Sequence, residues 1–267
     1  LDVRKANLYG DVGRDRTPYG QKVEDNILPE IIGELEKTSE YWERRKAIAE
    51  FNASSPVLKK GLALTPVKFG ISFTLMHLNQ AGALVHVYRD GSISLNHGGT
   101  EMGQGLFVKV AQVVAEEFGQ PLARVKITAT STAKVPNTGP TAASAGTDLN
   151  AQAARAACKA IKERLFDFIE QRWSVGRDAV QFREGKVIIG NQAMEFGELA
   201  EAAYRERVSL SSTGFYKTPK IHWDREKATG QPFFYFAYGA ACSEVTIDTM
   251  TGEMKVNRVD ILHDVGR

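Results

Sequence analysis

The sequence predicts an α+β fold in which mixed sheets pack against helices. Apolar residues recur at helical spacing in some stretches and alternate with polar residues in others. Between two alternating stretches stands Asp90-Gly91, a residue pair typical of tight β-hairpins. Because hairpins and helices follow one another along the chain, helices covering sheets are the arrangement that buries both kinds of apolar surface.

The N-terminal part predicts a lead-in followed by helices. Residues 1–24 are polar and contain turn-forming residues, so we expect them to be extended. Apolar residues at helical spacing from Asp25 to Phe51 predict two helices in tandem, with breaks near Gly33 and at Thr38-Ser39. Ser39 is the predicted N-cap of the second helix.

After these helices, the period of the apolar residues changes to two. This change predicts strands over Lys60–Leu78 and Ala83–Leu95, the latter folded as the Asp90-Gly91 hairpin. The remaining expected elements are a helix over Leu106–Phe118, a strand over Arg124–Thr130, a helix over Leu149–Arg172, a hairpin over Lys186–Phe196, a helix over Gly197–Arg205, and strands over Phe233–Tyr238, Cys242–Asp248 and Glu253–Leu262.

These elements suggest three consecutive segments. Residues 1–59 form the extended and helical lead-in, and residues 60–175 form an α+β unit that contains both glycine-rich loops described below. Residues 176–267 form a second, shorter α+β unit, which we expect to be truncated at its C-terminus.

Composition excludes several classes of function. With 43% hydrophobic and 25% charged residues, a net charge of +2 and no basic run, the chain predicts a globular protein with neither nucleic acid nor membrane as a partner. Cys158 and Cys242 form no Cys-x-x-Cys motif, so neither a disulfide framework nor an iron–sulfur or zinc site is encoded. We expect both cysteines to be buried, the five histidines to be structural or surface residues rather than metal ligands, and the compartment to be the cytoplasm.

Two glycine-rich loops carry the strongest functional signal. Residues 98–105 are Gly-Gly-Thr-Glu-Met-Gly-Gln-Gly, and residues 136–148 are Pro-Asn-Thr-Gly-Pro-Thr-Ala-Ala-Ser-Ala-Gly-Thr-Asp. Each precedes a predicted helix, whose N-terminal N–H groups can bind an anionic or polar cofactor group. Their spacing matches neither the dinucleotide-binding glycine motif nor the phosphate-binding P-loop. The pair therefore suggests one large cofactor held from two sides, and the alternative is that the glycines only turn the chain.

A resemblance to a known family favours the cofactor interpretation. The molybdenum-cofactor-binding part of the xanthine dehydrogenases, which are molybdenum hydroxylases, is similar to five segments of this chain: His97–Leu106, Thr130–Asn150, Lys68–Thr74, Ser211–Pro219 and Tyr238–Gly252. The match runs in order from Val3 to Arg267. It implies the α+β fold of that family's cofactor-binding domain and the binding of molybdopterin.

The resemblance assigns cofactor contacts to both loops. Met102, Gly103 and Gln104 match the first pterin-contacting loop, where backbone amides and a glutamine side chain hydrogen-bond the cofactor. The second loop is matched by Thr141, Ala142, Ala143 and Ser144, and the backbone of Ala143 is expected beside the molybdenum. No side-chain ligand to the metal is implied, because the dithiolene of the pterin holds it.

The resemblance also assigns half of a substrate pocket. Phe73 is expected to stack on a flat heteroaromatic ring, Thr74 to hydrogen-bond a purine heteroatom, and Leu78 to line the access channel. The family's base is a glutamate that we expect beyond Arg267, so no catalytic residue is assigned within this chain. Glu101 and Glu244 are the acidic residues nearest the matching motifs, and nothing in the sequence places either at the reacting carbon.

We therefore expect part of a xanthine-dehydrogenase-type molybdenum hydroxylase that acts on hypoxanthine or xanthine. The resemblance implies that 2Fe-2S clusters and FAD reside on other segments or subunits, that the enzyme is an oligomer, and that this chain alone is inactive. One alternative is an aldehyde oxidase or another hydroxylase of the same family. A second alternative, from a different class, is a catalytically silent assembly module.

Overall fold

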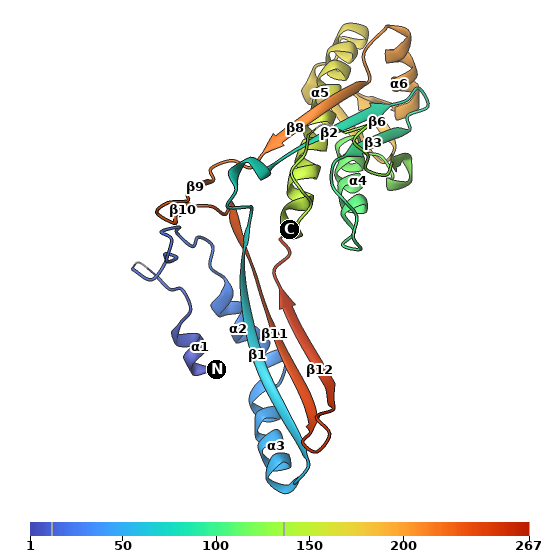
Figure 1. Ribbon diagram of the computed structural model, residues 1–267. Helices are drawn as coiled ribbons and strands as arrows, with labels where there is room; N and C mark the ends of the chain where they lie inside the picture. Colours follow the sequence, from blue (N-terminus) through green and yellow to red (C-terminus); the bar gives the residue numbers. More distant parts are fainter. Residues whose placement is uncertain (12, 136, 267) are drawn as a thin grey trace. The chain divides into compact units, whose positions relative to one another are not determined.

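The chain folds into two compact units, each described here by itself. The computed structural model describes residues 1–11, 13–135 and 137–266, and it confirms the α+β prediction (Figure 1). The first unit combines residues 1–71 with residues 220–267, and the second contains residues 72–219. This division differs from the three consecutive segments predicted, because strand β1 (Leu58–Ile71) pairs along its whole length with strand β11 (Tyr235–Asp248).

The first unit is built on an antiparallel sheet with the order β1-β11-β12. Its other elements are α1 (Asp2–Ala6), α2 (Leu28–Thr38), α3 (Tyr41–Ser54), β12 (Met254–His263), and the small pair β9 (His222–Asp224) and β10 (Thr229–Gln231). Buried residues of α2, such as Ile32 and Leu35, pack with Leu64, Tyr238 and Cys242 of the sheet.

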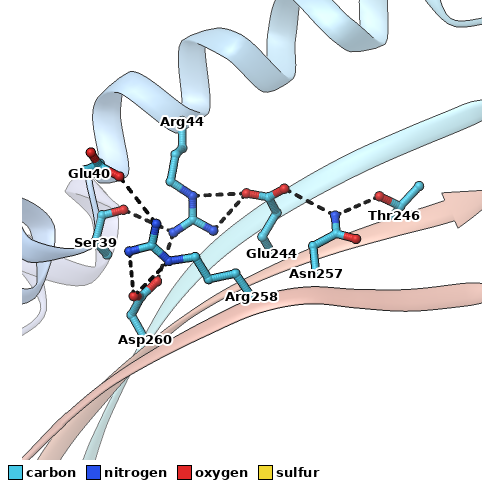
Figure 2. Close-up of polar contacts among 8 residues, drawn as sticks. All are labelled: Ser39, Glu40, Arg44, Glu244, Thr246, Asn257, Arg258 and Asp260. Carbon is cyan, nitrogen blue, oxygen red and sulfur yellow. Dashed lines mark hydrogen bonds and ion pairs between the residues drawn. The ribbon is translucent and has the colours of Figure 1, made fainter.

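Helix α3 is attached to this sheet mainly by polar contacts, since Tyr41 is the only residue of the helix that is buried. Arg44 donates to Glu244 from Nε (3.0 Å) and from its second terminal nitrogen (2.8 Å), and to Asp260 at 3.0 Å (Figure 2). Asp260 also accepts from Arg258 on the same strand. One guanidinium on α3 therefore connects the helix to both β11 and β12.

The second unit contains a four-stranded sheet with the order β4-β3-β2-β8. Its main elements are β2 (Gln80–Val87), β3 (Ile93–His97), α4 (Leu106–Glu117), β4 (Val125–Ile127), α5 (Gly146–Trp173) and β8 (Ser211–Lys217). The predicted hairpin is confirmed, since β2 and β3 pair across a turn in which Asp90 Oδ1 accepts from the N–H and hydroxyl of Ser92 and Gly91 has a φ of +79°. The predicted helices α4 and α5 are confirmed as well.

Helix α5 packs closely on the sheet of the second unit. A Cβ on Gly214 of β8 would lie 2.1 Å from the carbonyl oxygen of Ala153, so only glycine permits this approach.

Cys158 of α5 and Cys242 of β11 are free, buried thiols, as predicted. Within the described residues, no helix combines the length and the apolar composition that crossing a membrane requires.

A smaller sheet with the order β5-β6-β7 and helix α6 complete the second unit. The bounds are β5 (Val180–Arg183), β6 (Lys186–Ile189), β7 (Gln192–Glu195) and α6 (Phe196–Arg205). The predicted hairpin and helix in this region are confirmed.

Two strand predictions need correction. The strand expected over Lys60–Leu78 ends at Ile71, because Ser72 has a φ of +139° and turns the chain out of the sheet. The strands expected over Phe233–Tyr238 and Cys242–Asp248 form the single strand β11. Gly239 lies within this continuous strand, and a Cβ there would lie 3.3 Å from the His263 ring.

The helical lead-in also differs from the prediction. Residues 1–24 contain the short helix α1, and α2 runs through Gly33 without a break. Ser39 is not an N-cap. Its side chain is fully buried, its Oγ has no partner among the described residues, and Glu40, with a φ of +54°, stands at the N-cap position instead.

Candidate cofactor site

The first glycine-rich loop, residues 98–105, connects β3 to α4 and is organised by Glu101. The Glu101 carboxylate accepts N–H donors from Gly103 (2.9 Å), Gly105 (3.0 Å) and Phe107 (3.0 Å). These hydrogen bonds, the one from Phe107 above all, lower the pKa of the carboxyl group. The anion position at the N-terminus of α4, which the sequence suggested for a cofactor, is therefore occupied by a side chain of the loop itself.

Met102, Gly103 and Gln104 lie at the exposed tip of this loop. The Gln104 side chain accepts from the backbone N–H of Met102 (2.5 Å) and donates to the carbonyl of Thr100 (2.9 Å). An amide has two donor hydrogens and two acceptor lone pairs, so each end of Gln104 retains capacity for another partner. Gly103 has a φ of +95°, and a Cβ there would meet nothing within 4 Å.

The second loop contacts the first directly. The Thr141 hydroxyl accepts from the Thr100 backbone N–H at 2.8 Å. In the segment before the second loop, the Thr130 hydroxyl donates to the Gly99 carbonyl at 2.6 Å. A Cβ on Gly98 would lie 2.5 Å from Thr138, so glycine is required for the loops to approach this closely. The two small-residue loops therefore lie side by side.

Residues of both loops line one cavity of about 320 Å³. Its lining residues are Met102, Gln104, Leu106, Lys109, Ser144, Gly146 and Thr147. Three residues predicted to contact the cofactor therefore meet at one place. Gly103, Thr141 and Ala142, which were also predicted to contact the cofactor, are not among the lining residues. Ala143 begins a short 3₁₀ turn, and its side chain is outside the described part of the chain.

The N-terminus of α5 points its first turn at this cavity. This helix of 28 residues begins at Gly146, and no side chain among the described residues caps it by a hydrogen bond. Asp148 lies in its first turn, so one carboxylate is close to the positive dipole end of this helix as well. Lys109, which sequence reasoning did not select, adds a positive charge to the same cavity.

Two buried polar side chains lie beneath the first loop. The Nδ1 atom of His97 accepts from the Gly99 N–H at 3.1 Å, while burial lowers the pKa of His97 to about 4 and keeps the ring neutral. The His97 ring packs edge-on against Phe107. His97 Nε2 and Asn150 Oδ1 are buried and have no hydrogen-bond partner among the described residues. The histidine is therefore part of the loop's support.

The segment predicted to bind substrate forms a loop between residues 72 and 79. Phe73 and Leu78 are half-buried and Thr74 is exposed, and none of the three lines the 320 Å³ cavity. Sequence reasoning missed Asn79, whose buried side chain accepts from the Phe73 N–H (2.7 Å) and donates to the Phe73 carbonyl (2.8 Å). An asparagine that closes a short loop is a local signal that could have found it.

The substrate segment meets the second loop at Gly139. The Gly139 N–H donates to the Gln80 carbonyl at 2.9 Å, and a Cβ on Gly139 would lie 2.0 Å from the Leu78 carbonyl oxygen. The segment that contains Phe73 and the loop that contains Ser144 are thus fixed against each other through backbone.

Neither carboxylate named from the sequence is free for proton transfer. Glu101 binds three backbone N–H groups, and Glu244 forms an ion pair with Arg44 in the other unit (Figure 2). A larger surface cavity of about 640 Å³ beside α6 contains Glu201, whose carboxylate is paired with Arg89 and Arg205. Because the Glu201 charge is paired with these two arginines of the same unit, the smaller cavity between the loops is the better candidate site.

Comparison of the sequence with known families gives a consistent result. The family model of the molybdopterin cofactor-binding domain matches residues 34–267. Xanthine dehydrogenase/oxidase of Felis catus is 46% identical over 265 residues, and xanthine dehydrogenase of Emericella nidulans is 44% identical over 265 residues. Each alignment covers 99% of this chain and 18% of the relative, so the chain spans less than a fifth of the length of the relatives it matches.

Solved structures share the fold. Quinoline 2-oxidoreductase from Pseudomonas putida 86 has a TM-score of 0.81 at 20% identity, with 99% of this chain and 34% of that chain covered. Aldehyde oxidoreductase from Desulfovibrio gigas has a TM-score of 0.77 at 21% identity, with 99% of this chain and 26% of that chain covered. The resemblance and the fold class predicted from the sequence are confirmed.

Proposed function

This chain belongs to the molybdopterin cofactor-binding domain family, and we propose from that premise that it forms part of a xanthine-dehydrogenase-type molybdenum hydroxylase acting on a purine. The observation that carries the proposal is the meeting of both small-residue loops at one cavity. The relatives that are 44% and 46% identical are named xanthine dehydrogenases, which favours hypoxanthine or xanthine as the substrate.

The residues at the cavity fit the proposed cofactor. The ammonium group of Lys109 provides positive charge for an anionic group of the cofactor, and backbone N–H groups in the first turn of α5, which also contains Asp148, can donate to it. Met102, Gly103 and Gln104 would hold the pterin from one side. Thr141, Ala142, Ala143 and Ser144 would hold it from the other, with the Ala143 backbone beside the metal. When bound, the cofactor supplies the two-electron redox chemistry of hydroxylation.

In this proposal, the loop of residues 72–79, which contains Phe73, binds the substrate. Phe73 is half-buried, and its ring would stack on a planar purine. Thr74 would select a heteroatom, and Leu78 would line the access channel. The base would come from another part of the enzyme, because Glu101 and Glu244 are both engaged in the contacts described above.

The complete enzyme would therefore be larger than this chain. Iron–sulfur clusters and FAD are expected on other segments or subunits, and assembly into an oligomer is part of the same proposal. A cytoplasmic location is favoured by the two free thiols, since a reducing compartment keeps cysteines unpaired.

The test is a metal and substrate analysis of the full-length enzyme. We expect molybdenum to co-purify with the protein, and we expect xanthine and hypoxanthine to be turned over with a higher kcat/KM than aromatic aldehydes. A preference for aldehydes would favour the aldehyde oxidase alternative, which the aldehyde oxidoreductase of Desulfovibrio gigas shows to be compatible with this fold. Protein with neither metal nor turnover would favour a silent assembly module.

A further inference from the structure

We propose that Asn79 is a positioning residue that sets the conformation of Phe73 for substrate stacking. This inference rests on the proposed function, because it takes Phe73 as the residue that stacks on the purine. It is carried by the hydrogen bonds between the Asn79 side chain and the Phe73 backbone, which no other side chain of the described residues makes.

The Asn79 side chain acts on Phe73 as a neighbouring strand would. Its Oδ1 accepts from the Phe73 N–H at 2.7 Å, and its Nδ2 donates to the Phe73 carbonyl at 2.8 Å. The same Nδ2 also lies 3.4 Å from the Leu75 carbonyl and 3.3 Å from the Met76 carbonyl. Both backbone polar groups of Phe73 are thus fixed by one amide.

Asn79 is itself held rigidly. Its side chain is only 2% exposed, and its carbonyl accepts from the Thr218 N–H at 3.0 Å, next to the point where β2 begins at Gln80. A buried amide with both ends bonded loses little further freedom when substrate binds. Asn79 can therefore hold the Phe73 loop in a fixed position relative to strand β2.

The hydrogen bonds from Asn79 hold an unusual backbone conformation at Ser72, the residue before Phe73. Ser72 has a φ of +139°, a region that residues with a side chain rarely adopt. Such a conformation persists only where its neighbours determine it, and the Asn79 bonds to the next residue do so. Without them, Ser72 would relax and the direction of the Phe73 ring would change with it.

The test is a double-mutant cycle in the full-length enzyme with Asn79→Ala, Phe73→Ala and the double variant. Loss of an aromatic contact of about 0.5–1.5 kcal/mol corresponds to a decrease of about 2- to 13-fold in kcat/KM for xanthine. We expect Phe73→Ala and Asn79→Ala each to fall in this range, and the double variant to match Phe73→Ala within about two-fold. Molybdenum content should be unchanged in all three.

Two controls separate positioning from general destabilisation. Asn96 is also a buried asparagine of the same unit, and its side chain hydrogen-bonds Thr128 rather than the Phe73 loop. In the variant that combines Asn96→Ala with Phe73→Ala, the decrease in kcat/KM should therefore be the product of the two single decreases. Hydrogen exchange of the peptide that contains Phe73 should accelerate in metal-free Asn79→Ala. If that variant does not fold, Asn79→Asp, which keeps the acceptor and loses the donor, replaces it in the cycle.

The outcomes distinguish the inference from the proposed function. Effects of Asn79→Ala and Phe73→Ala that multiply, or loss of molybdenum in Asn79→Ala, would overturn the positioning role while leaving the role of Phe73 intact. Wild-type kinetics in Phe73→Ala would instead remove Phe73 from the pocket, and the positioning role would be overturned with it.

Discussion

Gly139→Ala tests how closely the substrate segment and the second loop must approach. The new Cβ would lie 2.0 Å from the Leu78 carbonyl oxygen, 3.0 Å from the Leu78 carbonyl carbon and 3.2 Å from the Gln80 carbonyl oxygen. Because these atoms are backbone, no rotamer change relieves the clash, and one loop must move by more than an ångström to reach ordinary van der Waals contact. Overpacking of this kind typically costs about 1–3 kcal/mol.

We expect Gly139→Ala to lower the free energy of unfolding of the second unit by about 1–3 kcal/mol and to reduce kcat/KM for xanthine. Chemical denaturation of the full-length enzyme, followed by hydrogen exchange in residues 72–219, measures the first effect. Gly176→Ala is the matched control, because Gly176 has a φ of −69° and a Cβ there would meet nothing within 4 Å. Equal stability and equal kinetics in the two variants would refute the close approach.

Three further predictions concern other parts of the chain. Burial lowers the pKa of His97 to about 4 from 6.5, so the unfolded state binds more protons between these values and stability falls with decreasing pH. Between pH 7 and pH 4.5 the free energy of unfolding of wild type should therefore fall by about 2–3 kcal/mol more than that of His97→Asn, and parallel stability–pH curves would contradict this. Arg44→Met leaves Glu244 and Asp260 without their shared cation, and we expect a loss of about 2–3 kcal/mol in the first unit, against less than about 1 kcal/mol for the exposed pair of Lys227→Met. Gln104→Ala should weaken cofactor retention by about 1 kcal/mol, seen as a faster loss of molybdenum on dilution, whereas an unchanged rate would show that the side chain only organises its own loop.

Local patterns predicted the elements that depend on neighbouring residues. The Asp90-Gly91 turn formed as expected because its side chain and its positive φ are properties of the turn itself. Helices α4 and α5 followed from apolar spacing alone. The resemblance supplied the pairing of the two loops, which composition could not, since contacts such as Thr100 to Thr141 join residues distant in sequence.

The sequence failed where tertiary contacts decide the outcome. A serine before a helix usually caps it, but Ser39 is buried, and the helix starts from Glu40. Strand β8 was not predicted, because its alternation is weak and its antiparallel pairing with β2 determines it. The helix N-terminus of α4 suggested an anion site, yet Glu101 fills it, so the nature of the anion could be known only from the folded loop.

Locating molybdenum in crystals of the full-length enzyme tests the central claim most directly. Anomalous diffraction measured at the molybdenum absorption edge gives the position of the metal without any assumption about the cofactor. We predict a single peak next to the backbone of residues 141–144, with pterin density reaching the cavity lined by Met102, Gln104 and Ser144. A molybdenum peak remote from both loops, in an enzyme that turns over xanthine, would contradict the assignment of these loops to the cofactor.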